Sequence, residues 1–408
     1  MRRPFPGGCW PTDDQILLLR AALLDPDSAQ AAWDRWRIGN SLDTTDSASL
    51  RLLPLAYRNL RSATLDESDV TKLKGAYRSA WVRNQLLFKR ASEALGELAE
   101  AGIQTMLLKG IALSVEHYGD TGVRPMEDID VLVPARDFEP AVGVLIRAGW
   151  LSDSSTQTSG LRTVHAEHLQ HRDGHALDLH RYALAQVADD EAFWTAAVEI
   201  ELLGVPTRAL CPADQLLHVA VHGARWNVVP PARWLADAVT IERSARVGLD
   251  WDRVVAEASR RRVTVTLADA LEHLVVALGF PVPPGVLERL RDAPKGPFER
   301  WAHRATLHPA GGGSWMPVVL DSYVRQSRVD DSLSLTGFLQ DFFGVETRGQ
   351  LARRVARKAG DVALAQSALR IAPNRVVACP ECDRLLVRRR SGRSVLCETC
   401  ARESRLLG

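Results

Sequence analysis

The segment that most constrains the fold is a short apolar run, residues 127–133, which carries two aspartates and is bounded by Pro125 and Pro134. Aliphatic and β-branched residues between two prolines are typical of a buried β-strand. Side chains alternate between the faces of a strand, so Asp128 and Asp130 share a face, with Cα atoms about 6.6 Å apart. Two carboxylates in an apolar strand are costly without a counter-charge. The segment therefore predicts a strand that binds one or two divalent cations, with a solvated edge strand as the alternative.

The hydrophobic pattern around this segment predicts its place in the fold. From residue 13 to about 100, apolar residues recur every three or four positions, which predicts helices, the last of them ending near Ala101-Gly102. From about 90 to 200, predicted helices and strands alternate. The predicted elements are a strand at 105–108, a helix at 111–118, the strand at 127–133, a helix at 138–148, and two strands at 161–171 and 175–181 joined by a turn at Asp173-Gly174.

The rest of the chain is expected to be mainly helical. An amphipathic pattern runs from Pro212 to about residue 300. Residues 308–317 contain three consecutive glycines and predict a loop or hinge, and residues 318–370 predict increasingly basic helices.

Two further pieces point to phosphate chemistry. Lys109-Gly110 lies between a predicted strand and a predicted helix, where glycine allows close backbone approach, amide groups can donate to a phosphate, and the lysine adds a positive charge. On a later predicted strand, Asp178 and His180 share a face. Three carboxylates and a phosphate-binding turn indicate phosphoryl or nucleotidyl transfer assisted by two metal ions.

These residues, together with Tyr118 and Arg124, resemble the nucleotidyltransferase superfamily over about residues 85–245. More narrowly, they resemble a poorly characterised bacterial branch in which Lys-Gly stands where Gly-Ser is usual. The resemblance implies an α+β fold, with a small mixed sheet flanked by helices and followed by a helical domain. It also implies Mg²⁺-dependent transfer of a nucleoside monophosphate from an NTP to an acceptor.

The resemblance assigns roles to individual residues. Asp128 and Asp130 would be Mg²⁺ ligands, and Asp178 would be the third carboxylate of the magnesium site and the base. The NTP would be held by Lys109 and Gly110, with Arg124 as a further candidate and His180 beside the third carboxylate.

The remaining histidines are open to two interpretations. Within 16 residues the chain has His165, His168, His171, His175 and His180. A zinc site would need three or four ligands within tetrahedral reach, and no spacing here requires that. Solvated or structural roles are therefore favoured for all except His180. In the helical region that follows, the candidate pocket residues, for which a structural role is equally open, are His222, Arg225 and Asp237.

Four of the six cysteines form the motif with the most specific spacing, Cys-x2-Cys-x14-Cys-x2-Cys. Two such pairs complete a tetrahedral Zn²⁺ site, and a segment this short needs the metal to fold. Redox-active cysteines are the alternative. The predicted ligands of this zinc ribbon are Cys379, Cys382, Cys397 and Cys400.

The formal net charge of +1 is a sum over two unequal parts. Residues 351–408 hold 13 basic and 5 acidic residues, a local charge of +8, and the first 350 residues carry −7. An arginine-rich zinc ribbon suggests a nucleic-acid partner, and docking to a protein or to the acidic part of this chain is the alternative. Clustered rather than dispersed cysteines, and the lack of any run of about 18 apolar residues, lead us to expect a cytoplasmic protein without membrane contact.

The sequence thus predicts five regions and two functions of different class. The leading hypothesis is an Mg²⁺-dependent nucleotidyltransferase whose acceptor is a small molecule, RNA or protein. The alternative is a non-catalytic nucleic-acid-binding or adaptor protein built on a decayed transferase domain. The predicted regions are an N-terminal helical region at 1–90, the catalytic domain at 91–205, a helical domain at 206–305, a hinge and basic helical region at 306–370, and the zinc ribbon at 371–408.

Overall fold

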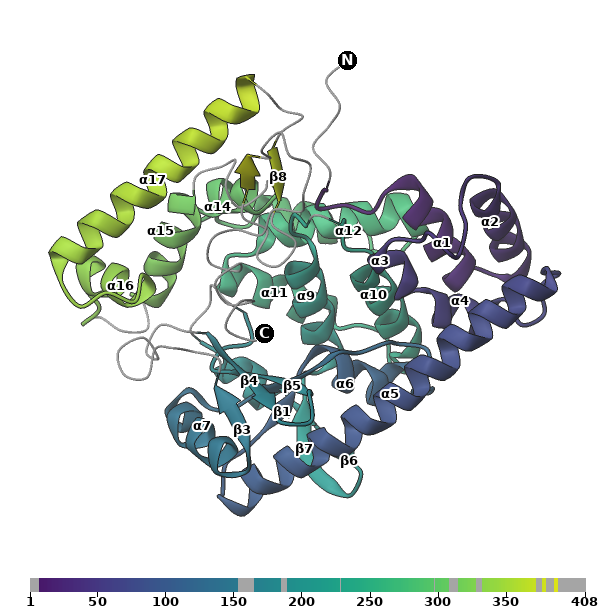
Figure 1. Cartoon of the computed structure of the whole chain (residues 1–408), viewed down its shortest axis with the longest axis horizontal. Coiled ribbons are helices and arrows are strands. Elements are labelled where there is room, and N and C mark those ends of the chain that lie inside the picture. The colour runs from purple at the N-terminus through teal and green to yellow at the C-terminus, as the bar shows by residue number, and fades with distance from the viewer. Residues whose placement is uncertain are drawn as a thin grey trace. The chain divides into compact units, whose positions relative to one another are not determined.

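The computed structural model describes the chain except for residues 1–6, 153–164, 185–188, 228, 297, 308–314, 328–331, 372–375, 379–384 and 388–408. The chain divides into two compact units. Their helices and strands are labelled in Figure 1. The larger unit comprises Pro11–Gly223 and Ala232–Pro294, and the smaller unit comprises Met1–Trp10, Ala224–Pro231 and Lys295–Gly408. The finer division into five regions stays a prediction.

The larger unit begins with helices, as the sequence predicts, and the last of them ends close to the predicted position. Thr12 caps the first helix through a capping box, in which its hydroxyl accepts from the Gln15 amide and the Gln15 side chain accepts from the Thr12 amide. The last helix ends at Glu100, with Ala101 as its C-cap and Gly102 following at φ 73°. These helices are α1 (Asp13–Leu23), α2 (Pro26–Gly39), α3 (Ser47–Leu50), α4 (Leu53–Asn59) and α5 (Glu67–Glu100).

Among the described residues, seven strands form one mixed sheet in the order β3-β4-β5-β2-β1-β7-β6. The β2–β5 and β1–β7 pairs are parallel, and the other neighbouring pairs are antiparallel. The mixed sheet flanked by helices confirms the predicted fold class. The strands are β1 (Met106–Leu107), β2 (Asp128–Leu132), β3 (Trp150–Ser152), β4 (Ala166–His171), β5 (Ala176–His180), β6 (Val198–Leu202) and β7 (Val205–Ala209).

Three of these strands were not predicted. β3 has only three residues, and the β6–β7 hairpin extends the sheet beyond β1. The hairpin turns at Leu203 and Gly204, which both have positive φ, as a tight two-residue turn requires. Short strands of this kind carry little periodicity, so pairing with a neighbour decides their conformation.

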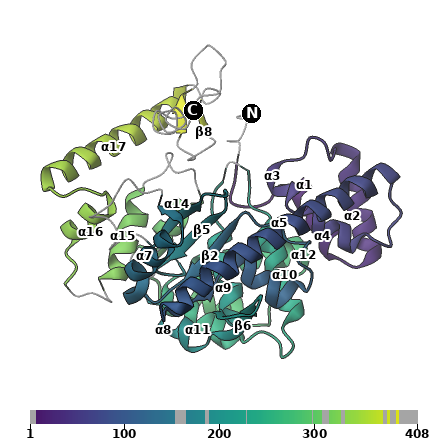
Figure 2. The same cartoon turned by 60° about the horizontal axis from the view of Figure 1, so that its bottom comes forward.

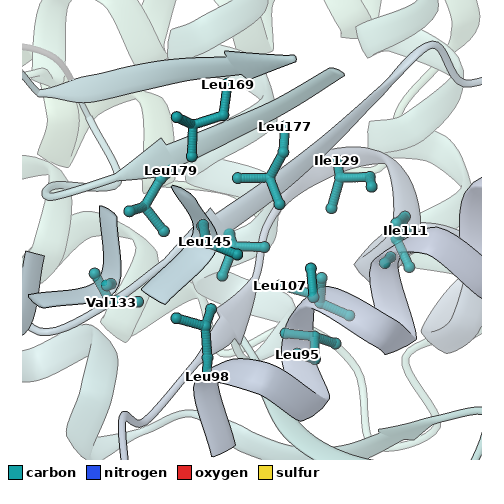
Figure 3. Packing of buried hydrophobic residues seen from close by; sticks show 14 of the residues in the cluster. Leu95, Leu98, Leu107, Ile111, Ile129, Val133, Leu145, Leu169, Leu177 and Leu179 are labelled. Carbon is teal, nitrogen blue, oxygen red and sulfur yellow. The ribbon is translucent and has the colours of Figure 1, made fainter. Parts of the chain in front are cut away.

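One face of the sheet carries the hydrophobic core. Ile129 of β2 and Leu177 and Leu179 of β5 pack on this face (Figure 3). Val131 of β2 belongs to the same hydrophobic cluster. The core is covered by α5 and by α7 (Phe138–Arg147), and the long helix α5 is visible against the sheet in Figures 1 and 2. Each buried aliphatic side chain contributes about 1.5–3 kcal/mol to the free energy of folding. Because alternate residues of β2 and β5 face this core, the aspartates of both strands lie on the opposite face.

Helices complete the larger unit on either side of the β6–β7 hairpin. Gly223 at the end of α9 packs so closely on Trp234 of α10 that an added Cβ would lie 2.2 Å from the indole Cγ. The helices in this part of the unit are α6 (Lys109–Leu113), the π-helical turn η1 (Ser114–Tyr118), the 3-10 turn η2 (Ala135–Asp137), α8 (Glu191–Thr195), α9 (Pro212–Gly223), α10 (Arg233–Ser244), α11 (Trp251–Arg261), α12 (Thr264–Leu278) and α13 (Val286–Asp292).

The described part of the smaller unit is mainly helical, as predicted. One boundary is corrected: residues 315–317 belong to the predicted loop but form the first turn of a helix, where a proline at 317 is tolerated. The other residues of that loop, 308–314, lie outside the described residues. The elements are α14 (Glu299–Thr306), α15 (Trp315–Gln326), α16 (Leu335–Phe342), α17 (Arg348–Ile371), β8 (Val376–Ala378) and β9 (Leu385–Val387).

The predicted zinc ligands cannot be placed in this unit. All four cysteines, Cys379, Cys382, Cys397 and Cys400, lie outside the described residues. On either side of the first pair, β8 and β9 form an antiparallel two-stranded sheet. Across the parts of the chain that are described, no helix is both long and apolar enough to cross a membrane.

Candidate active site

The candidate site is built on the sheet face opposite the hydrophobic core. Asp130 of β2 lies directly across from Asp178 of the parallel strand β5, and Asp178 lies directly across from His168 of the antiparallel strand β4. This register forms a row of three functional side chains across three strands. Asp128 and His180 lie on the same face by strand alternation.

Asp130 is the centre of the site. Its side chain is 2% exposed, and its Oδ1 accepts from Lys109 Nζ at 2.6 Å and from His180 Nε2 at 2.9 Å. Burial acts to raise the pKa of Asp130, but the hydrogen bond from His180 and the positive charge of Lys109 outweigh it and lower the pKa well below its usual range. Asp130 is therefore ionised at neutral pH and already surrounded by cationic and donor groups.

Asp128 is in the opposite electrostatic situation. Burial raises the pKa of this half-buried carboxyl, and the negative charge of Asp130 raises it further. Lys109 and Arg233 oppose the rise only in part. The site therefore has a deficit of positive charge at Asp128, which a divalent cation would relieve.

A group of possible ligands lies close enough to surround one ion. One ligand atom from each of Asp130, Asp178 and His180 lies within 4.8 Å of the others. Asp128 is not a member of this group, although it shares the face. The structure thus brings together two of the three predicted carboxylates with the histidine that the sequence placed beside the third.

The Lys109-Gly110 turn approaches the same carboxylate. Lys109 has φ 44°, a left-handed conformation that costs a residue with a side chain about 1–2 kcal/mol. The turn is held by the Leu108 amide, which donates to the Asp130 carbonyl at 3.0 Å. A Cβ at Gly110 would lie 3.0 Å from both Arg124 Nη1 and Met126 Sδ, so a larger residue here would require these two side chains to shift.

Arg124 is held by a buried carboxylate. Its Nε and Nη2 donate to the two oxygens of Asp237 at 2.8 and 2.9 Å, and Tyr118 donates to Asp237 Oδ1 at 2.7 Å. Burial acts to raise the pKa of Asp237, and the charge of Arg124 lowers it below its usual range. Arg124 thereby links the predicted catalytic region to α10.

Arg233 is a neighbour of the site that the sequence analysis passed over. Its Nη1 donates to the Pro125 carbonyl at 2.8 Å, and its charge acts on Asp128. Burial lowers the pKa of Arg233 to about 10, which still leaves it charged at neutral pH. In the sequence, Arg233 is one residue of an amphipathic helix beside Trp234. Only the tertiary fold shows that it lies near the aspartates.

The histidines divide into structural and site residues. His171 and His175 each place Nδ1 within 3 Å of Asp173 Oδ1 at the β4–β5 turn, which agrees with the structural role expected for them. His218 donates from Nε2 to the Ala183 carbonyl, and burial lowers its pKa to about 3. A solvated or structural role was also expected for His168, but its Nδ1 lies 2.7 Å from Oδ1 of the candidate site residue Asp178. Its position opposite Asp178 depends on the strand register.

Comparison with protein-family models identifies the family of this chain. Residues 47–279, more than half of the chain, match the sequence model of a family described as uncharacterised nucleotidyltransferase. The chain therefore belongs to this family of nucleotidyltransferases. The match contains every residue of the candidate site and confirms the transferase class predicted from the sequence. A comparison with curated proteins finds no match.

Comparison with solved structures gives matches of low similarity that cover part of this chain. The lincosamide antibiotic adenylyltransferase LnuA, bound to lincomycin, is 17% identical over 29% of this chain and 77% of its own, with a TM-score of 0.23. The antibiotic-resistance factor ANT(2'')-Ia is 18% identical over 46% and 95%, with a TM-score of 0.31. An antigenic nucleotidyltransferase-like protein from Paracoccidioides brasiliensis is 16% identical over 52% and 94%, with a TM-score of 0.32.

Proposed function

We propose that this nucleotidyltransferase moves a nucleoside monophosphate from an NTP to an acceptor hydroxyl, and that the reaction depends on Mg²⁺ bound at Asp128, Asp130 and Asp178. The observation that carries the proposal is the approach of the possible ligand atoms of Asp130, Asp178 and His180 to within 4.8 Å of one another. Asp128 adds a carboxylate on the same face, and burial together with the negative charge of Asp130 raises its pKa. Carboxylate oxygens and phosphate oxygens are the ligands that Mg²⁺ prefers.

The candidate residues have separate roles in the proposed reaction. Magnesium, when bound, neutralises phosphate charge and aligns the reacting oxygens. Asp178 accepts the proton of the acceptor hydroxyl, whose oxygen forms a bond to the α-phosphorus while the bond to the bridging oxygen breaks and pyrophosphate leaves. Lys109 lies 2.6 Å from Asp130, and once the carboxylate holds a metal ion its ammonium group is available to the triphosphate.

Gly110 and Arg124 form the other side of the proposed triphosphate site. Arg124 Nη1 lies 3.0 Å from the position that an added Cβ at Gly110 would occupy, so a guanidinium nitrogen lies near this glycine. Nε and Nη2 of the same side chain are bonded to Asp237, which orients the guanidinium. We therefore assign Nη1 to a phosphate oxygen, a charge-assisted hydrogen bond of the stronger kind.

The test is incubation of the full chain with each of the four NTPs, labelled at the α-phosphate, and with Mg²⁺. Released pyrophosphate and label transferred to added small molecules, RNA or protein are both measured. We expect Asp130→Asn to reduce turnover at least a hundredfold. The matched control is Asp252→Asn, because the Asp252 side chain is 87% exposed and pairs only at the surface with Arg289. Equal turnover of wild type and Asp130→Asn would refute the proposal.

We propose that the four C-terminal cysteines bind one structural Zn²⁺. The support is the sequence spacing of the two Cys-x2-Cys pairs. Metal analysis of the purified chain should give one zinc per molecule, and Cys379→Ser should lose it. Cys211→Ser is the control, since Cys211 lies outside the motif. Zinc retained by Cys379→Ser would contradict the assignment.

We propose that nucleic acid is a partner of the C-terminal region, which is also the basis of the non-catalytic alternative. The first half of α17 presents four exposed arginines, and residues 347–360 contain no acidic residue. Such a surface binds phosphates with release of counterions. Charge reversal at Arg353 and Arg357 should weaken RNA binding and reduce its salt dependence. If the wild-type chain transfers no nucleotide but binds RNA in this way, the alternative of a non-catalytic nucleic-acid-binding protein holds. The four arginines are Arg348, Arg353, Arg354 and Arg357.

A further inference from the structure

His168 makes a contact that its position on an exposed strand did not suggest. Its Nδ1 lies 2.7 Å from Asp178 Oδ1, and the two residues face each other directly across the β4–β5 pair. Directly opposed residues on antiparallel strands are the closest cross-strand neighbours, so the sheet register itself holds the contact. Asp178 in turn lies opposite Asp130. The imidazole therefore stands at the end of the row that carries the candidate metal ligands.

The other carboxylate–imidazole pairs described in this part of the sheet differ from the His168–Asp178 pair in position and exposure. His171 and His175 share Asp173 at the hairpin turn, on the residues that reverse the chain. His180 and Asp130 form a pair whose side chains are only 4% and 2% exposed. In the His168–Asp178 pair, by contrast, the His168 side chain is 50% exposed and the Asp178 side chain is 29% exposed. Of the aspartates in the row, Asp178 is thus the one that an acceptor can reach from solvent.

We propose that His168 is a positioning residue for Asp178 in the transfer reaction. This inference rests on the function proposed above. An ionised carboxylate can only accept hydrogen bonds, so Nδ1 of His168 carries the hydrogen and donates it to Oδ1. With Oδ1 engaged, Oδ2 is the oxygen that takes the proton of the acceptor hydroxyl. The hydrogen bond holds one rotamer of Asp178 and aims that oxygen before the acceptor arrives.

The kinetic test compares three variants of the full chain. His168→Ala should lower kcat about 10- to 100-fold, the usual effect of losing a partner that orients a reacting group, and should leave KM for the NTP within about twofold. His168→Asn should restore most of kcat, because its amide nitrogen occupies the place of Nδ1. His175→Ala removes an imidazole–carboxylate contact from the same hairpin and should leave kcat unchanged. An unchanged kcat in His168→Ala, or equal loss in the Asn and Ala variants, would overturn the proposal.

A spectroscopic measurement keeps the inference separate from the proposed activity. In a chain labelled with ¹⁵N-histidine, two-dimensional NMR should show His168 with its hydrogen on Nδ1. Replacing Asp178 by alanine should change the chemical shifts of the His168 ring and leave those of His175 unaffected. If the wild type shows this signature but transfers no nucleotide, the proposed function fails and the contact stands. If His168 lacks a hydrogen on Nδ1, the positioning role fails whatever the turnover.

Discussion

Breaking the buried pair between Arg124 and Asp237 should destabilise the larger unit strongly. Asp237→Asn leaves the guanidinium without its charge partner and sets an amide N–H donor against the N–H donors of Arg124. The two side chains are only 4% and 5% exposed, so water cannot replace the lost interaction. Removing one partner of a buried ion pair costs about 3–5 kcal/mol of the free energy of unfolding. For a unit of this size that corresponds to a fall in Tm of about 6–20 °C.

The assay is thermal unfolding followed by circular dichroism, with a surface pair as the control. Lys72 and Asp43 make a contact of 2.6 Å, but their side chains are 44% and 68% exposed. Asp43→Asn should therefore change the free energy of unfolding by less than about 1 kcal/mol. Replacing Arg124 and Asp237 together by methionine and leucine should recover most of the loss, because no unpaired charge remains. Equal Tm shifts for Asp237→Asn and Asp43→Asn would refute the reasoning.

Three further predictions follow from buried positions. Burial lowers the pKa of His218 to about 3 in the folded chain, so the unfolded chain binds an extra proton as the pH drops below about 6.5. The free energy of unfolding of the wild type therefore falls with falling pH. Between pH 7.5 and 5.5, urea unfolding should show that His218→Gln loses about 1.4 kcal/mol less of this free energy than the wild type. Gly223→Ala should destabilise by about 1–3 kcal/mol, because its Cβ would meet the ring of Trp234, whereas Gly75→Ala on the open face of α5 should stabilise by about 0.5–1 kcal/mol in the same assay. Asp128→Asn should raise Tm while abolishing transfer, because it removes a carboxylate whose pKa is raised by burial and by the charge of Asp130. An unchanged or lower Tm would contradict the inference that the negative charge of Asp128 is unfavourable in the folded chain.

Much of the catalytic region follows from local sequence patterns. The alternation of Asp128, Ile129 and Asp130 places carboxylates on one face and an apolar side chain on the other, and the core confirms the buried side of this prediction. The turn at Asp173-Gly174 and the end of α5 near Ala101 also lie where their residues predict. These features depend on contacts within a few residues, which a single sequence contains.

The unpredicted elements depend on contacts between distant segments. β6 and β7 join the sheet through the parallel pairing of β7 with β1, about one hundred residues earlier in the chain. Arg233 lies near Asp128 because its guanidinium donates to the carbonyl of Pro125, more than one hundred residues earlier in the chain. No periodicity along the chain contains that information, so the sequence predicted neither these two strands nor the place of Arg233 beside the aspartates.

The sequence by itself identified the candidate side chains for the chemistry: an aspartate pair in an apolar strand, a third aspartate two residues before a histidine, and a Lys-Gly turn. Strand alternation and turn geometry are local, which is why these could be read directly. The tertiary structure alone decided that Asp130, rather than Asp128, is the buried centre contacted by Lys109 and His180, and that His168 stands opposite Asp178. Strand register sets those distances, and it is determined by the packing of the whole sheet rather than by any one segment.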